Sequence, residues 1–227
     1  MRIQADRVSV DGPHGRLLPP TSLTVAGGEL ALLHGDPGTG LTAFGLALAG
    51  RLRPGTGAVT LDGDDDRAGL RRAVGLVDVP GVSEPDDALP LRVVVGEELA
   101  LARRGAGRAE VAAWLAAHDL APYAGTRFEN LEPAVRTRLL ADLAAARPGV
   151  VALVLDTPDR HTSDTGGWWT LATEHAARGL AVVVLTATVP SAALPAEAAR
   201  AGSDEQPAPT RCAPEPVPAG EAEGAGE

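Results

Sequence analysis

Residues 29–42 read ELALLHGDPGTGLT, a short apolar run followed by a glycine-rich loop and the start of a helical pattern. The stretch matches the phosphate-binding loop pattern G-x-x-x-x-G-K-[ST] at all but one position. The matching residues are Gly35, Asp36, Pro37, Gly38, Thr39, Gly40 and Thr42, and Leu41 stands where the pattern has lysine. The sequence therefore predicts a loop of the phosphate-binding type that lacks its cation.

A strand that ends in such a loop turns its backbone NH groups toward one point, and the following helix directs its positive dipole end there. We expect the amides of Gly38, Thr39 and Gly40 to cradle a phosphate and the Thr42 hydroxyl to be a possible Mg²⁺ ligand. Leu41 offers no charge. The bland alternative is that the loop is only a tight turn between a strand and a helix.

No other residue is expected to replace the missing lysine. The chain has no lysine, since all 20 basic residues are arginine. Arg51 and Arg53 lie at least ten positions beyond Leu41 along the predicted helix. At helical rise this is roughly 15 Å or more, so neither side chain can reach back to the loop.

The composition fits one α/β domain with a full core, since 44% of the 227 residues are hydrophobic. A net charge of −10 argues against nucleic acid and anionic lipid as main partners, because both bind basic patches. Cys212 is the only cysteine, which excludes an internal disulfide and a thiolate zinc site and indicates a reducing compartment. Because the sequence shows no secretion signal and no apolar run of membrane-spanning length, we expect a cytoplasmic protein.

Strand and helix patterns alternate along the chain, as in an α/β protein with a mainly parallel sheet. We expect strands at 2–10, 21–26, 29–34, 57–63, 73–79, 150–156 and 180–188, with a Gly/Pro loop between the first two. We expect helices at 42–52, 64–72, 91–103, 108–118, 133–146 and 166–178. The helices between 91 and 146 have no strand among them, so they indicate a helical insert subdomain at about 82–146.

The last part of the chain differs in composition from the rest. Residues 196–227 are rich in Ala, Glu, Pro and Gly and show no periodicity. We interpret this part as a disordered acidic tail that follows a single domain at 1–195.

The order of these features resembles the nucleotide-binding cassette of ABC transporters over residues 1 to about 190. The segment PGTGAVTLDGDD (54–65) is similar to the strand and turn after the cassette's glycine loop, and NLEPAVRTRLLADLAAARPGVVALVLDTPD (130–159) is similar to the stretch from the signature motif to the Walker B strand. The resemblance implies a P-loop NTPase-like fold with ATP and Mg²⁺ as ligands. It also implies a partner, which would be a membrane subunit or a second cassette in a homo- or heterodimer, at the inner face of the membrane.

The resemblance implies that several groups which act on ATP are missing. Asp156 matches the Walker B aspartate that holds Mg²⁺, but Thr157 stands where the family has the glutamate that polarises water. Residues 131–135 (LEPAV) stand in place of the signature L-S-G-G-Q, with Glu132 opposing a phosphate and Pro133 lacking an NH. Ala187 replaces the switch histidine.

Three further positions are compared with the family's pattern. Val79 falls near the glutamine of the family's Q-loop, and Asp164 corresponds to the D-loop aspartate only if a small length difference is allowed. No aromatic residue that could stack on the base lies near Gly12, where His14 is the available substitute. The histidines at 34, 118, 161 and 175 do not have the spacing of a metal cluster.

These losses predict a degenerate cassette that binds ATP weakly and hydrolyses it poorly or not at all. The alternative is a cassette-shaped scaffold or regulatory module that works without nucleotide. A true ATPase that uses unusual residues is the third interpretation. Gly38, Gly40, Thr42 and Asp156 favour the first, whereas Leu41, Thr157 and Glu132 favour the second.

Overall fold

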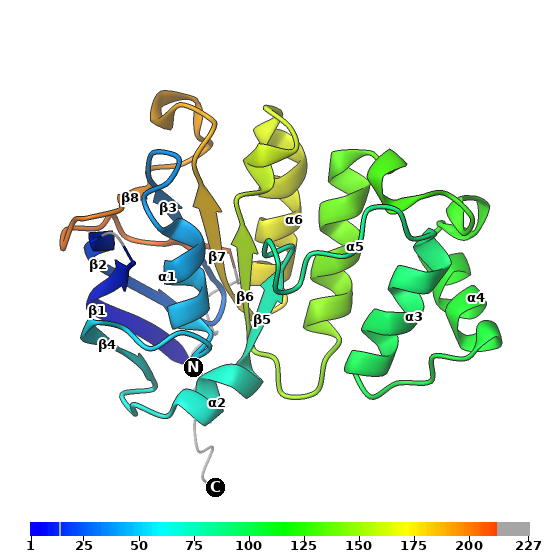
Figure 1. Ribbon diagram of the computed structural model, residues 1–227, viewed down its shortest axis with the longest axis horizontal. Helices are drawn as coiled ribbons and strands as arrows, with labels where there is room; N and C mark the ends of the chain where they lie inside the picture. The colour runs from blue at the N-terminus through cyan, green and yellow to red at the C-terminus, as the bar shows by residue number, and fades with distance from the viewer. Residues whose placement is uncertain (14, 213–227) are drawn as a thin grey trace, which may run out of the picture.

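The computed structural model describes residues 1–13 and 15–212 and contains two sheets (Figure 1). The smaller sheet is antiparallel, in the order β2-β1-β4, and consists of β1 (Arg2–Gly12), β2 (Gly15–Ala26) and β4 (Thr56–Leu61). The larger sheet has the order β5-β6-β7-β3-β8, and β9 also pairs with β3. Its strands are β3 (Glu29–His34), β5 (Val74–Val77), β6 (Ala152–Asp156), β7 (Ala181–Thr186), β8 (Ala199–Arg200) and β9 (Thr210–Arg211). All of its pairings are parallel except that of β9.

Helices cover both faces of the larger sheet. On one side lie α1 (Leu41–Leu48) and α2 (Arg67–Ala73) together with the smaller sheet, and on the other lie α5 (Pro133–Ala145) and α6 (Thr165–Ala177). Alternate residues of each strand enter opposite cores: Leu33 and Val183 pack toward α1, whereas Leu32 and Val184 pack toward α5 and α6. This period of two explains why the strands are apolar throughout.

The helical insert projects from one edge of the sheet (Figure 1). It contains α3 (Leu91–Leu101) and α4 (Arg108–Ala117), the short 3₁₀ turns η1 (Ala121–Tyr123) and η2 (Phe128–Asn130), and then α5. Two more 3₁₀ turns, η3 (Pro158–Arg160) and η4 (Ser191–Ala193), follow β6 and β7. The predicted fold class is therefore confirmed: a mainly parallel sheet flanked by helices, with a helical insert.

The first two strands are longer than the sequence predicts. The residues expected to form a Gly/Pro loop extend both strands, and Gly12 pairs with Gly15 at the hairpin end. Pro19 and Pro20 are tolerated because β2 lies at the edge of the small sheet, where no neighbour needs their NH groups. Leu18 is fully buried, which anchors this part of β2 on the core.

The predicted disorder from residue 196 is wrong for the part of the tail that the structure describes. β8 and β9 extend the larger sheet beside β3, and Ala199 is buried. The amide of Ser22 donates to the carbonyl of Ser203, and the amide of Cys212 donates to that of Gly28. The remainder of the predicted tail, 213–227, lies outside the described residues.

Candidate functional site

The glycine loop connects β3 to α1, as the motif predicts (Figure 1). Gly38 and Gly40 have φ values of 88° and 79°, a left-handed conformation that suits glycine. Within residues 1–13 and 15–212, neither of these two amides donates a hydrogen bond to a protein atom. The amide of Thr39 differs from the expectation, because it donates to the carbonyl of Asp36 at 3.1 Å. The loop therefore keeps free donors next to the N-terminus of α1.

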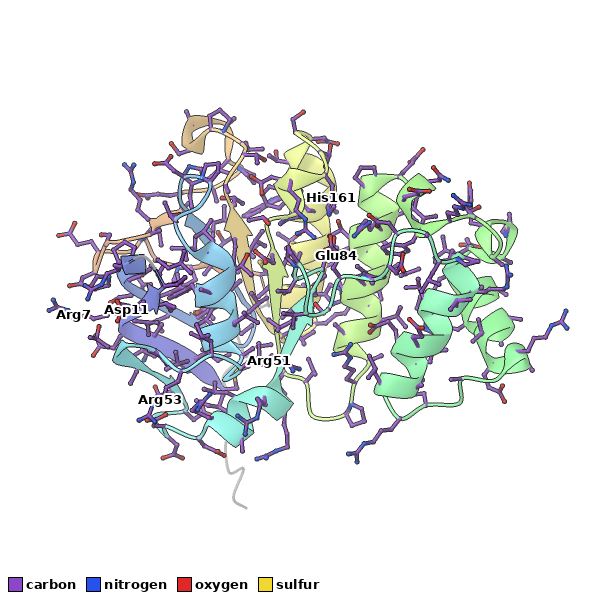
Figure 2. The ribbon with its side chains drawn as sticks, in the orientation of Figure 1. Arg7, Asp11, Arg51, Arg53, Glu84 and His161 are labelled. Atoms are coloured by element: carbon purple, nitrogen blue, oxygen red, sulfur yellow. The ribbon has the colours of Figure 1, made fainter. Side chains whose placement is uncertain are left out.

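Leu41 is buried, with 5% of its surface exposed, and packs back over the loop. Its side chain lies close to Gly35, since a Cβ atom added to that glycine would be 3.4 Å from Cδ2 of Leu41. Arg51 and Arg53 lie near the opposite end of α1, as Figure 2 shows, so they do not replace the missing lysine. An apolar side chain thus occupies the position where the motif supplies an ammonium group.

Thr42 and Asp156 meet at the carboxyl end of the sheet although they are 114 positions apart in the sequence. The Thr42 hydroxyl, in the first turn of α1, donates to Oδ2 of Asp156 at the end of β6, at 2.8 Å. Asp156 is 2% exposed, and burial raises the pKa of its carboxyl, partly offset by the Thr42 hydrogen bond and the charge of Arg160. A hydroxyl and a carboxylate are the oxygen ligands that Mg²⁺ prefers, so this pair fits the metal.

Thr157, the residue after Asp156, is the next group at this end of the sheet. Its φ of 45° is left-handed, which is unfavourable for a β-branched residue. Its hydroxyl lies 3.4 Å from Oδ1 of Asp156 and 3.4 Å from Nη1 of Arg160. A hydroxyl has no basicity at neutral pH, so no general base stands at this position.

Comparisons with known proteins show what the chain is similar to. No protein-family model matches the chain. It is 34% identical over 188 residues to a protein of Streptomyces coelicolor that carries the name ABC transporter ATP-binding protein. The match covers 78% of this chain and 64% of that relative, so the chain spans less than two thirds of the relative's length.

Solved structures with the same fold are ATP-binding components. The ATP-binding subunit of an ABC transporter superposes with a TM-score of 0.58 at 18% identity, over 83% of this chain and 80% of that one. A nucleotide-free ATP-binding cassette superposes with a TM-score of 0.56 at 14% identity, over 83% of this chain and 82% of that one. A bacterial Atm1-family exporter with ATP bound gives 0.56 at 21% identity, over 82% of this chain and 34% of the exporter chain. The chain is therefore similar in sequence to an ABC transporter ATP-binding protein and has the fold of ATP-binding cassettes.

In this chain, the segment at the position of the signature motif starts α5. Pro133 is the first helical residue and Glu132 precedes it as the N-cap, without a side-chain capping bond. Together with Thr162 and Asp164, these residues line a small cavity of about 210 Å³. Asp164 caps α6 by accepting from the amide of Gly166 at 2.9 Å, which gives the aspartate a structural role.

The segment after β7, where the family has its switch histidine, is held by an aspartate that the sequence analysis did not identify. Oδ2 of Asp159 accepts from the amides of Ala187, Thr188 and Val189 at 2.9, 2.6 and 3.0 Å. Asp159 is 4% exposed. A buried carboxylate thus fixes the backbone of the switch segment, while the side chain of Ala187 offers no polar group.

The position near the Q-loop contains a second group that the sequence analysis missed. Val79 is buried, and the residue before it, Asp78, carries the polar function. Asp78 lies at the end of β5 and receives two hydrogen bonds from Arg136 of α5, at 3.1 and 2.9 Å, and one from His161 at 2.9 Å. Only the apolar pattern around Arg136, VRTRLL, could have indicated that this arginine faces inward.

Asp78, Glu84 and His161 have ligand atoms within 4.8 Å of one another, which is close enough for a metal site. Two guanidinium groups already supply the positive charge, because Arg136 and Arg160 both pair with Asp78 and Glu84. A cation would be repelled by them. The cluster is therefore an internal ion-pair network and not a metal centre. His14, the available substitute for the aromatic residue that stacks on the base, lies outside the described residues.

Among the described helices, none combines the length and the apolarity that a bilayer span requires.

Proposed function

We propose that this chain is a degenerate cassette of an ABC system, which binds ATP weakly and hydrolyses it poorly or not at all. The observation that carries the proposal is the glycine loop itself, with free amides at Gly38 and Gly40 but a buried leucine at position 41. Each charge-assisted hydrogen bond to phosphate that the missing lysine would make is worth about 1.5 to 3 kcal/mol. Losing one or two of them weakens binding without removing the cradle.

Mg²⁺ would be held by Thr42 and Asp156. Both provide hard oxygen atoms, and among the described residues Asp156 makes no direct ion pair, so its buried charge is available to a cation. When bound, the ion would neutralise phosphate charge. The two side chains would bind and orient it at the start of α1.

Slow or absent hydrolysis follows from the groups near Asp156. Thr157 cannot take a proton from water, and loss of a positioned general base typically costs about 10²- to 10⁴-fold in rate. Glu132 and Pro133 at the signature position oppose phosphate with charge and remove a donor. The groups near Asp156 and the groups at the signature position are therefore both defective for hydrolysis of ATP.

We infer that the cassette acts with a partner, either a membrane subunit or a second cassette, in a homo- or heterodimer. A groove of about 480 Å³ between the insert and the core supports this, because its lining combines the exposed apolar side chains of Val82 and Leu101 with charged ones such as Arg147. Apolar side chains exposed together mark surfaces that partners cover. A membrane subunit would hold the protein at the inner face of the membrane.

The alternative is a scaffold or regulatory module that has abandoned nucleotide. The observation that favours it is the network around Asp78, in which arginine side chains fill the interior where the insert meets the core. In that case the surfaces, and not the glycine loop, carry the function.

Direct measurement of ATP binding separates the two. With Mg²⁺ present, calorimetric titration of the purified chain should give a measurable but weak affinity, and phosphate release should remain at the background rate. Asp156→Asn is the control, because it removes the metal ligand and reveals contaminating ATPase. Turnover on the order of 1 per second that is abolished by Asp156→Asn would contradict the proposal. Absence of any binding at millimolar ATP would favour the scaffold.

A further inference from the structure

Asp78 is the centre of a buried charge network that joins five parts of the chain. Its side chain is 6% exposed and accepts a two-pronged contact from Arg136, whose side chain is also 6% exposed. Such fork-to-carboxylate pairing fixes both distance and orientation. The end of β5 and the helix α5 are therefore held together by a directional bond as well as by apolar packing.

Arg136 extends the network to the insert. Its Nη1 donates to Asp87 at 2.6 Å, and its Nη2 lies 3.5 Å from Glu84. Its guanidinium also stacks 4.6 Å above the ring of Phe128, in the turn before α5. One buried side chain thus contacts the segment that leads into α3, the turn that leads into α5 and the core strand β5.

Arg160 and His161 extend the network to the end of β6. Nη2 of Arg160 donates to the carbonyl of Asp78 at 2.6 Å and to Glu84 at 3.2 Å, and its Nη1 donates to the carbonyl of Asp156. Figure 2 shows Glu84 and His161 close together where the sheet meets α5. The loops that follow the two parallel strands are joined by one guanidinium group.

The backbone conformation fits this role. Asp78 and Thr157 both have left-handed φ values, 56° and 45°, although neither is glycine. Such conformations persist only where surrounding contacts impose them. Arg160 contacts both residues and so stabilises both strand ends.

We propose that this network is a latch, which fixes the helical insert on the sheet without nucleotide. In proteins switched by nucleotide, contacts to the γ-phosphate and its metal hold the loops at strand ends in place. Here protein side chains supply those charged contacts, and they satisfy one another inside the fold. The orientation of the insert is then constant whether or not ATP is bound, and the latch stands even if the weak-binding proposal fails.

Hydrogen exchange of the full chain tests the latch, and α5 itself offers a matched control. Arg136→Gln removes the two-pronged contact of the guanidinium group with Asp78. Arg138 lies two positions further along α5, and Arg138→Gln removes only its exposed ion pair with Glu174. We expect Arg136→Gln to speed exchange of the amides in 79–89 and 128–140 by at least about tenfold, which corresponds to ~1.4 kcal/mol of local opening. Arg138→Gln should leave these rates within about twofold, as expected for an exposed pair.

The second readout is the effect of nucleotide. Adding ATP and Mg²⁺ to the parent chain should leave exchange in the same two segments unchanged. Slower exchange there by about tenfold on adding ATP would overturn the proposal, as would equal rates in the parent and Arg136→Gln. Binding measured in the same samples separates this outcome from the proposed function, because ATP can bind weakly and still leave the insert unmoved.

Two milder variants keep the test valid if Arg136→Gln does not fold. Arg136→Lys retains the charge but loses the fork, and Asp87→Asn weakens one contact whose carboxylate side chain is 55% exposed. Both should speed exchange in 79–89 and 128–140 above the Arg138→Gln control, Arg136→Lys by more than Asp87→Asn. Exchange at the control rate in both would overturn the latch.

Discussion

Leu41 is the residue whose side chain most limits the glycine loop as a phosphate site. Leu41→Lys should raise ATP affinity at least about tenfold, because the new ammonium adds one or two charge-assisted bonds of about 1.5 to 3 kcal/mol each. Titration of ATP into the parent and the variant measures the change. Hydrolysis should stay at background, since Thr157 and Glu132 are unchanged.

Leu41→Met is the matched control, because it keeps the volume and adds no charge. A folded Leu41→Lys variant that binds ATP no better than Leu41→Met would mean that the loop amides do not form a cradle. The scaffold interpretation would then replace weak binding.

Asp156 is a buried carboxylate whose charge lowers the stability of the fold when no cation is bound. Burial raises its pKa in the folded state, so folding favours the protonated form, and the stability this gives at low pH is lost as the pH rises through the folded pKa. Asp156→Asn, neutral and still able to accept from Thr42, should therefore equal or exceed the parent in melting temperature at pH 7.

The same variant tests the metal site. Mg²⁺ with ATP should raise the melting temperature of the parent and leave that of Asp156→Asn unchanged. A loss of about 2–4 °C in the variant without ligand, equivalent to about 1 kcal/mol in a protein of this size, would instead mean that the charge stabilises the fold.

At the scale of elements, the short strands β8 and β9 complete the sheet beside β3. They supply backbone bonds to both ends of β3, and Gln206 accepts from the amide of Thr24 at 2.8 Å. A chain truncated after residue 198 should melt about 4–8 °C below one truncated after residue 212. This corresponds to about 2 kcal/mol from several backbone hydrogen bonds of about 0.5–1.5 kcal/mol each.

Thermal unfolding followed by circular dichroism measures the difference between the two truncated chains. Equal melting temperatures would mean that residues 199–212 only rest on the sheet.

At the scale of the whole molecule, the network around Asp78 makes the free energy of unfolding depend on pH. Burial acts to raise the pKa of Asp78, but hydrogen bonds from His161 and Arg136 and the charges of Arg160 and Arg136 hold it at about 2. A depressed pKa stabilises the fold above the unfolded value near 3.8, and this contribution is lost as the pH falls toward 2.

Denaturant titrations at pH 7, 4 and 2.5 should therefore show a smaller advantage of the parent over Asp78→Asn as the medium becomes acidic. The contribution of Asp78 to the free energy of unfolding that depends on pH is about 2 kcal/mol. The pKa of Asp78 falls from 3.8 to about 2 on folding, and each pKa unit corresponds to about 1.36 kcal/mol. Asp65→Asn, at an exposed position, is the control. A difference between the parent and Asp78→Asn that does not vary with pH would contradict a charged Asp78 in the latch.

The elements of the fold were largely predictable because their signals are local. Apolar runs with the period of a parallel strand, the glycine loop between β3 and α1, and the helical patterns of α3 to α5 each depend on residues near one another in the chain. The absence of a cation at Leu41 and of a base at Thr157 was equally visible. That Thr42 and Asp156 hold Mg²⁺ stays a prediction, and the structure places their side-chain oxygens 2.8 Å apart.

The contacts that replace the missing groups were decided by tertiary structure alone. Asp78 meets Arg136 and His161 across 58 and 83 positions, and Asp159 meets the switch segment across about thirty. Nothing in a local pattern distinguishes these carboxylates from solvated ones. Likewise β8 and β9 are two residues long and become strands only because β3 offers unpaired backbone groups beside them. Local sequence determined where each element lies, whereas burial, which makes an isolated charge costly, determined which charges had to find one another.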